Sequence, residues 1–242
     1  MAAKLYSLSL SHPGHAARIM LERKGIDHEV VELMPGMHPV QVRLAGFRGG
    51  TVPALRIDGR RIQGSREIAH ALDEIEPEPA LFPADPARRR AVEAAEAWGE
   101  RNLQPVPRRC FRWALSNHPE LRSRLARSMG MPAPDVVAAV QAPLARYFAR
   151  KSEATDEGVR SNVEALPTML DHVDELIADG TIGDEEPNAA DLQIGTSVRV
   201  LLSFEDLHPM VEGRPAEQLA MRVLPEYPGR TPAVIPPEWL SS

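Results

Sequence analysis

A proline-rich segment at residues 76–86, EPEPALFPADP, constrains the fold of this chain more than any other feature. The segment contains four prolines in eleven residues. Because each proline lacks a backbone N–H and fixes its own φ, the segment can continue neither a helix nor a central strand. We therefore predict a linker at residues 77–87 between one domain at residues 1–76 and a second domain at residues 88–242.

The sequence before the linker alternates between the apolar period of two that indicates strands and the spacing that indicates helices. Its predicted strands are residues 4–10, 28–33, 51–57 and 60–63, and its predicted helices begin at His15, Val40 and Ser65. The dipeptide Asp58-Gly59 between two apolar runs is a strong hairpin signal, and Ser65 is a candidate N-cap for the third helix. The order βαβαββα predicts an α/β domain.

The sequence after the linker is predicted to be almost entirely helical. Helical spacing predicts helices at residues 88–103, 108–115, 119–129, 135–151, 157–179 and 188–202. Asn188 and Asp191 have the spacing of a capping box, with Asp in the position usual for Glu, and the helix that they open is apolar enough to be central. The last 20 residues contain five prolines, so we expect an extended tail that lies on the surface and is pinned by Trp239.

Composition excludes several classes of protein. The formal charge of −6 comes from 34 acidic and 28 basic residues mixed along the chain, which argues against a nucleic-acid partner. No apolar stretch approaches the roughly 20 residues that span a bilayer. The N-terminus lacks the pattern of a signal peptide, so we expect a cytoplasmic protein with no membrane partner. The single cysteine, Cys110, excludes an internal disulfide, a two-cysteine redox motif and a cysteine-rich zinc site.

Four loops of the first domain carry polar groups to one edge of its predicted sheet. The loops at Ser11 and Ser65 stand at helix N-termini, where free N–H groups and the helix dipole favour an anion. Arg66 adds a guanidinium beside the second of these positions. The bond before Pro53 can be cis, because X-Pro bonds tolerate this form at small cost. The loops are Ser11-His12-Pro13-Gly14, Pro35-Gly36-Met37-His38, Thr51-Val52-Pro53 and Gly64-Ser65-Arg66.

Two further residue types have plainer interpretations. His12 and His15 are spaced i, i+3, as metal ligands on a helix can be. No carboxylate or third histidine lies at a matching spacing, so we predict no metal and expect both rings to be solvated. Cys110 is more typical of a buried small hydrophobe than of a nucleophile, because nothing near it in sequence indicates a low pKa.

These residues together resemble one known family, the cytosolic glutathione transferases. The resemblance rests on the order of elements, the run Thr-Val-Pro-Ala-Leu at residues 51–55, the proline-rich linker and the helical second half. It implies a thioredoxin-like N-terminal domain followed by an all-α C-terminal domain. It is closest to the theta-like classes that use a serine, because Ser11-His12-Pro13 and Gly36-Met37-His38 match their loops. In those classes the serine activates the thiol and the histidine contacts the glycine end of glutathione.

The resemblance also implies the rest of a glutathione site. Pro13 completes the Ser-x-Pro run, Val52 before a cis Pro53 bonds the cysteinyl backbone, and Ser65 holds the γ-glutamyl carboxylate with Arg66 beside it. This sequence departs from the family at Gly64, where a Glu or Gln that binds the γ-glutamyl group is usual. We therefore expect glutathione to bind weakly unless another residue supplies an acceptor.

The function that the resemblance implies is the joining of glutathione, or a related thiol, to a small, largely apolar electrophile, with glutathione as co-substrate. From position alone, we expect the electrophile to contact Trp98, Arg101, Cys110 and Trp113. A homodimer is also implied. Gly64 favours an alternative, a non-catalytic binding or interaction module of the same fold. A thiol–disulfide oxidoreductase is disfavoured, because the first loop has Ser and Gly where such an enzyme needs Cys.

Overall fold

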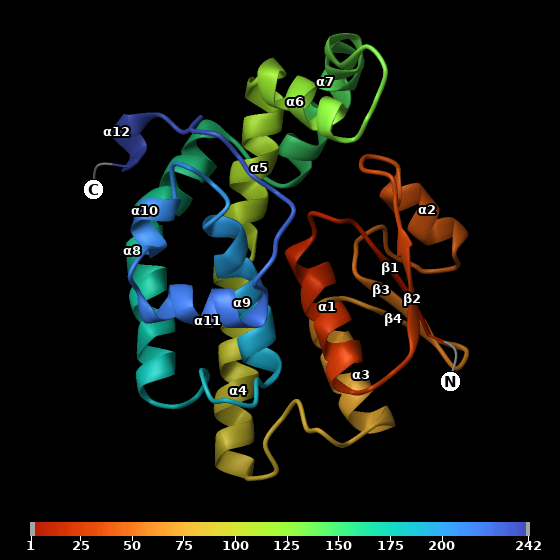
Figure 1. Cartoon of the computed structure of the whole chain (residues 1–242), viewed down its shortest axis with the longest axis vertical. Helices are drawn as coiled ribbons and strands as arrows, with labels where there is room; N and C mark the ends of the chain where they lie inside the picture. The colour runs from red at the N-terminus through yellow and green to blue at the C-terminus, as the bar shows by residue number, and fades with distance from the viewer. Residues whose placement is uncertain (1–2, 241–242) are drawn as a thin grey trace.

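A mixed four-stranded sheet forms the N-terminal domain in the computed structural model, which describes residues 3–240 (Figure 1). The strands are β1 (Ala3–Ser7), β2 (His28–Glu32), β3 (Ala54–Ile57) and β4 (Arg60–Gln63). Their order in the sheet is β2-β1-β3-β4, with β2 parallel to β1 and β3 antiparallel to it. Asp58 and Gly59 both have positive φ, 44° and 82°, and close the β3–β4 hairpin as predicted.

Helices cover both faces of this sheet. α1 (His12–Arg23) and α3 (Ser65–Ile75) pack on the face that carries Leu5 and Leu55, and their apolar cluster continues into the helical half of the chain. α2 (His38–Leu44) covers the other face, where Val42 and Phe47 form a smaller cluster. The order βαβαββα of the N-terminal domain is therefore confirmed.

The helical half follows as a run of helices joined by short connections. Its elements are α4 (Pro86–Trp98), a π-helical turn η1 (Gly99–Leu103), α5 (Pro105–Asn117), α6 (Pro119–Ser128), α7 (Pro134–Lys151), α8 (Asp156–Ala178), α9 (Ala189–Leu201), α10 (His208–Val211), α11 (Pro215–Val223) and α12 (Pro237–Leu240). Figure 1 shows these helices packed beside the N-terminal domain, with α6 and α7 extending beyond α5. Among residues 3–240, no helix is both long enough and apolar enough to cross a lipid bilayer.

α9 is the central helix, as its apolar sequence predicts. Arg199 is its one residue that is not buried. The predicted capping box is present: Asn188 Oδ1 accepts from the N–H groups of Ala190 and Asp191, and Asp191 Oδ2 accepts from the N–H of Asn188 at 2.9 Å. α9 contacts α1, α3, α4 and α11, so it joins the N-terminal domain to the helical half.

Several boundaries differ from the prediction for local reasons. α1 begins at His12 rather than His15, because Ser11 caps it and Pro13 is tolerated in the first turn. The prediction that Ser65 caps α3 is wrong, since Gly64 is the N-cap and no side chain caps that helix. α11 was not predicted from the sequence. The tail does lack regular structure between α11 and α12, and Trp239 packs against Trp113 with ring centroids 5.3 Å apart.

Candidate functional site

The sheet topology brings the four predicted loops to one edge. β1 and β2 are parallel, so the loops that follow Ser7 and Glu32 leave the same edge. The register pairs Tyr6 with Ala54 and Ala54 with Gln63, so β3 begins and β4 ends at that edge. The loops at Ser11, His38, Pro53 and Ser65 therefore belong to one surface of the N-terminal domain.

Ser11 stands at the N-terminus of α1 as its N-cap. Its Oγ accepts a hydrogen bond from the N–H of Gly14 at 3.2 Å, and its carbonyl accepts from the N–H of His15 at 2.9 Å. Gly14 leaves room for the Ser7 side chain, because a Cβ at position 14 would lie 2.0 Å from Ser7 Oγ. A hydroxyl that accepts through one lone pair still has its O–H free to donate. Ser11 can therefore cap the helix and donate to an anion at the same time.

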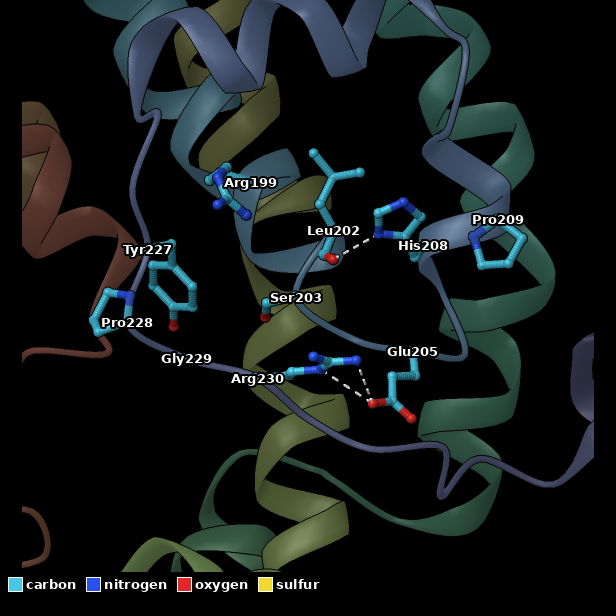
Figure 2. Close-up of a pocket in the computed structure, with 10 residues that line it drawn as sticks. All are labelled: Arg199, Leu202, Ser203, Glu205, His208, Pro209, Tyr227, Pro228, Gly229 and Arg230. Carbon is cyan, nitrogen blue, oxygen red and sulfur yellow. Dashed lines mark hydrogen bonds and ion pairs between the residues drawn. The ribbon is translucent and has the colours of Figure 1, made fainter. Parts of the chain in front are cut away.

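The C-terminal tail fixes the loop before Ser11 from the other side. Tyr227 donates a hydrogen bond from its hydroxyl to the carbonyl of Leu10 at 3.0 Å, and its ring meets that of His15 edge to face. Tyr227 also lines a cavity of ≈ 550 Å³ between α9, α10 and the tail (Figure 2). None of the predicted site residues lines that cavity. The contact of Tyr227 was not predicted, since nothing in the local pattern relates residue 227 to residue 10.

His38, the first residue of α2, packs against α7. Its ring stacks on Phe148 with centroids 5.7 Å apart, and its Nδ1 is buried with no hydrogen-bond partner among residues 3–240. Burial, reinforced by the charges of Arg112 and Lys151, lowers the pKa of His38 to about 4. The imidazole is therefore neutral at pH 7, with one N–H to donate.

The bond between Val52 and Pro53 is cis, as the sequence allowed. Pro53 is buried, and its carbonyl accepts a hydrogen bond from the N–H of Gly64 at 3.0 Å. This bond joins the third loop to the fourth. The backbone of Val52 lies at the edge of the sheet, one residue before the buried proline.

Ser65 and Arg66 both contact the helical half. Ser65 is buried, and its hydroxyl donates to Oε1 of Gln193 on α9 at 3.1 Å. Arg66 donates through Nε to Oε2 of Glu96 on α4 at 3.3 Å. The N–H groups in the first turn of α3 have no intrahelical acceptor. An anion at this helix would therefore meet backbone N–H groups while the two side chains hold α3 against α4 and α9.

Gly64 has a neighbour that the sequence did not point to. Its φ is +104°, which is unfavourable for a side chain, and a Cβ there would lie 2.1 Å from Oε2 of Glu67. The exposed Glu67 carboxylate thus occupies the space into which a side chain at position 64 would project. Glu67 lies at i+3 from Gly64 in the first turn of α3, and that spacing is the signal that could have identified it.

His12 is buried, so the expectation that it is solvated is wrong. Its Nε2 has no hydrogen-bond partner among the described residues, and the backbone of Gln104, just before α5, lies beside the ring. Burial and the charge of Arg108 lower the pKa of His12 well below its usual value. His15 is half-buried and its Nε2 contacts the carbonyl of Ser9 at 2.7 Å.

The residues expected to contact the electrophile do not all come near Ser11. Trp98 meets His172 of α8, and Trp113 donates to Asp156 at 2.7 Å and packs on Trp239. Cys110 is fully buried, and burial raises the pKa of its thiol to about 12. These three side chains pack within the helical half. Arg101 is exposed on η1.

Residues 3–240 contain no group of three or more His, Cys, Asp or Glu side chains that could hold a metal ion. The site that the structure does assemble consists of a serine, two neutral histidines, a cis-proline loop and two helix N-termini along one sheet edge. These are groups that bind an anion or a peptide-like ligand rather than a cation.

The fold is a thioredoxin-like domain followed by a helical half, and the candidate site lies at the sheet edge of the first domain. Residues 5–80 match the family model described as glutathione S-transferase, N-terminal domain, and every loop of the candidate site lies within the match. The N-terminal third of the chain is therefore similar to the N-terminal domain of glutathione S-transferases.

Known structures share this fold over nearly the whole chain. A glutathione S-transferase from Sinorhizobium meliloti 1021 has a TM-score of 0.64 at 18% identity, covering 100% of this chain and 99% of that one. A glutathione S-transferase from Methylobacterium radiotolerans, in complex with glutathione sulfonate, has a TM-score of 0.55 at 20% identity, covering 92% of this chain and 90% of that one. These likenesses concern the fold.

Curated relatives match a shorter part of the chain. Maleylacetoacetate isomerase of Mus musculus is 34% identical over an alignment of 113 residues that covers 42% of this chain and 49% of that protein. The match thus spans about half the length of the relative.

Glu96 gives the contact between α3 and α4 a predicted pH dependence. Burial raises the pKa of Glu96 to about 8, although the charge of Arg66 and its hydrogen bond act to lower it. The charges of Glu100 and Glu67 raise this pKa further. The Nε2 atom of His70 lies 3.6 Å from Oε2 of Glu96. A folded-state pKa above the unfolded value makes stability fall as the pH rises from about 5 to about 8, by up to about 1.4 kcal/mol per pH unit. Glu96→Gln cannot ionise and should lose this slope.

The measurement is urea unfolding of the wild type and Glu96→Gln at several pH values. The half-exposed Glu93, on the same helix, supplies the control variant Glu93→Gln. Parallel stability curves for wild type and Glu96→Gln would show that Glu96 is ionised in the folded protein.

Proposed function

We propose that this chain is a glutathione-dependent transferase in which the Ser11 hydroxyl stabilises the thiolate of the bound peptide. The observation that carries the proposal is the position of Ser11, at the N-terminus of α1 and on the same sheet edge as the other three loops. A serine in this role is typical of the theta-like classes. We keep the cytosol as its predicted location, because glutathione is most abundant there as a reduced thiol.

Thiol activation is the chemical task of such a site. A free thiol with a pKa of about 8.5 is only a few per cent ionised at pH 7. A hydroxyl donor and a helix N-terminus both stabilise the anion and so lower this pKa. Cys110 cannot supply the thiolate itself, because it is buried and burial raises its pKa to about 12. The nucleophile is therefore a thiol brought by a co-substrate.

The remaining loops would hold the rest of glutathione. In the proposed arrangement the backbone of Val52, before cis-Pro53, bonds the cysteinyl unit, while neutral His38 donates its N–H at the glycine end. The first-turn N–H groups of α3 receive the γ-glutamyl carboxylate, with Ser65 and Arg66 positioning that helix against α9 and α4. Pro13 shapes the first turn of α1 beside Ser11.

The reaction begins with attack of the thiolate on an electrophilic carbon. Conjugation keeps the new C–S bond, whereas a thiol-assisted isomerisation would form it and break it again. Ser11 serves the first step of either reaction. The match to a maleylacetoacetate isomerase over part of the chain makes isomerisation the second candidate activity.

Replacing Ser11 tests the activating group. Ser11→Ala should lower the glutathione-dependent rate far more than it weakens glutathione binding, because the hydroxyl acts on the thiolate. Loss of the cap should lower the free energy of unfolding by about 1 kcal/mol. Stopped-flow detection of the thiolate absorbance, calorimetry and thermal unfolding separate these effects. Ser9→Ala, an exposed serine of the same loop, is the control.

Activity that is unchanged in Ser11→Ala would exclude Ser11 as the activating residue. Glutathione binding by the wild type without any thiolate signal would instead support the non-catalytic module.

We further propose that Glu67 receives the ammonium of the γ-glutamyl group, which Gly64 cannot do. Its carboxylate lies at the position of a side chain on residue 64, and no ion-pair partner within 4.0 Å is present among residues 3–240. A lost hydrogen bond to a charged group is worth about 1.5–3 kcal/mol. Glu67→Gln should therefore weaken glutathione binding by roughly 10- to 100-fold.

Calorimetry on wild type and Glu67→Gln, with glutathione and with its analogue lacking the α-amino group, measures this contribution. The variant should bind the analogue as the wild type does. Glu74→Gln, exposed on the same helix, is the control. Equal losses for both ligands would assign Glu67 to helix stabilisation alone. Gly64→Glu is a poor test, because the positive φ strains any side chain there.

The homodimer implied by the family is the last part of the proposal. Exposed apolar side chains lie on α2 of the N-terminal domain, at Val40 and Leu44, and on α7 of the helical half, at Val136 and Val140. An interface between the N-terminal domain of one subunit and the helical half of the other would cover both sets. Sedimentation should give twice the chain mass of 26.6 kDa.

Leu44→Asp should shift the protein toward the monomer, whereas Met221→Asp, on α11, should not. A wild-type monomer at micromolar concentration would contradict the dimer.

A further inference from the structure

Two arginines on α5 face the N-terminal domain without a carboxylate partner. Arg108 and Arg112 are four residues apart and therefore lie on the same side of the helix. Arg108 donates to Oε1 of Gln104 at 2.8 Å, and the guanidinium of Arg112 lies 5.7 Å from the ring centroid of Phe148. Neither forms an ion pair within 4.0 Å among residues 3–240. Their neighbour Arg109, in contrast, is paired with Glu153 at 2.9 Å.

This pair of charges is partly withdrawn from water. Burial lowers the pKa of Arg108, with a smaller effect of Arg109, and burial together with Arg108 lowers the pKa of Arg112 to about 10. Glu100 acts on Arg108 in the opposite direction. Two like charges in a partly desolvated position are unfavourable unless an anion joins them. Both side chains are half-buried, and only Arg112 has no hydrogen bond or ion pair at its guanidinium in the described part of the chain.

The opposite side of this region carries the two neutral histidines. His38 stacks on the same Phe148 ring that Arg112 faces, so α2, α5 and α7 meet at Phe148. His12 lies beside the backbone of Gln104, whose side chain bonds Arg108, and its buried Nε2 has no partner among residues 3–240. His12 directly follows Ser11, so this cluster adjoins the proposed thiolate position.

We infer that the electrophile accepted here carries an anionic oxygen group, such as a carboxylate, which Arg108 and Arg112 bind while the thiolate at Ser11 attacks an electrophilic carbon of the same molecule. This inference rests on the proposed function and replaces the expectation of a largely apolar electrophile. It also differs from the expected contacts with Trp98, Cys110 and Trp113, whose side chains pack inside the helical half.

A binding experiment without glutathione tests the anion site independently of the proposed activity. The probes are 3,5-dinitrobenzoate and its neutral counterpart 1,3-dinitrobenzene, neither of which has a leaving group. Equilibrium dialysis should show that the wild type binds the carboxylate more tightly. Arg112→Gln should reduce this preference by roughly 10-fold or more, and Arg108→Gln should do likewise. Arg109→Gln, which removes an arginine already paired with Glu153, is the control and should leave it unchanged.

A kinetic experiment then places the anion site beside the thiolate. With 4-chloro-3,5-dinitrobenzoate and neutral 2-chloro-1,3-dinitrobenzene, the glutathione thiolate forms a C–S bond as the C–Cl bond breaks and chloride leaves. The ratio of the two kcat/KM values, divided by the ratio of the uncatalysed rates, should fall about 10-fold in Arg112→Gln. The KM for glutathione should not change.

Three results would overturn the inference. These are equal binding of both probes by the wild type, equal losses in Arg112→Gln and Arg109→Gln, and a loss of glutathione affinity with no change in the carboxylate preference, which would assign Arg112 to the glycine carboxylate of glutathione. If the protein bound dinitrobenzoate preferentially but turned over neither aryl chloride, the anion site would be supported and the proposed transferase activity would be contradicted.

Discussion

The packing of α9 against α1 is the contact on which the rest of this structure depends. α9 is buried along almost its whole length and also contacts α3 and α4, so it fixes the N-terminal domain against the helical half. A helix end inside a protein must satisfy its free N–H groups, and Asn188 and Asp191 do this at the start of α9. Since α1 carries Ser11 at its N-terminus, the position of Ser11 relative to α5 follows from this contact.

The features that the sequence predicted are those that short-range chemistry determines. Asp58-Gly59 specifies a tight hairpin by its backbone preferences, and Asn188 and Asp191 specify a helix start by hydrogen bonds three residues apart. The order of strands and helices, and hence the edge to which the four loops belong, follows from such signals. Only the structure shows which side chains from other elements lie near each loop.

The features that the sequence did not predict depend on contacts between distant segments. His12 is buried because the segment just before α5 lies against it, roughly ninety positions along the chain. Ser65 does not cap α3, because it is the first residue of the helix and Gly64 holds the cap position; its hydroxyl donates instead to Gln193 on α9. The arginines of α5 have the same helical period as any exposed basic stripe. Only the position of α2 and α7 around Phe148 distinguishes them from a solvated face.

Between the two halves, burial raises the pKa of acidic groups and lowers the pKa of basic groups. These opposite shifts determine which side chains stay charged at pH 7. It raises the pKa of Glu96 and lowers those of His12 and His38, so these three groups tend toward their neutral forms. An arginine keeps its charge at pH 7 even with a pKa lowered to about 10, as for Arg112. The region between α1, α2 and α5 is therefore positive in a protein whose formal charge is −6.

The electric field of this positive region is local, because salt screens interactions beyond a Debye length of about 8 Å at physiological ionic strength. It acts on a ligand that has already reached the site, and it therefore bears on which electrophile is held rather than on how fast any electrophile arrives.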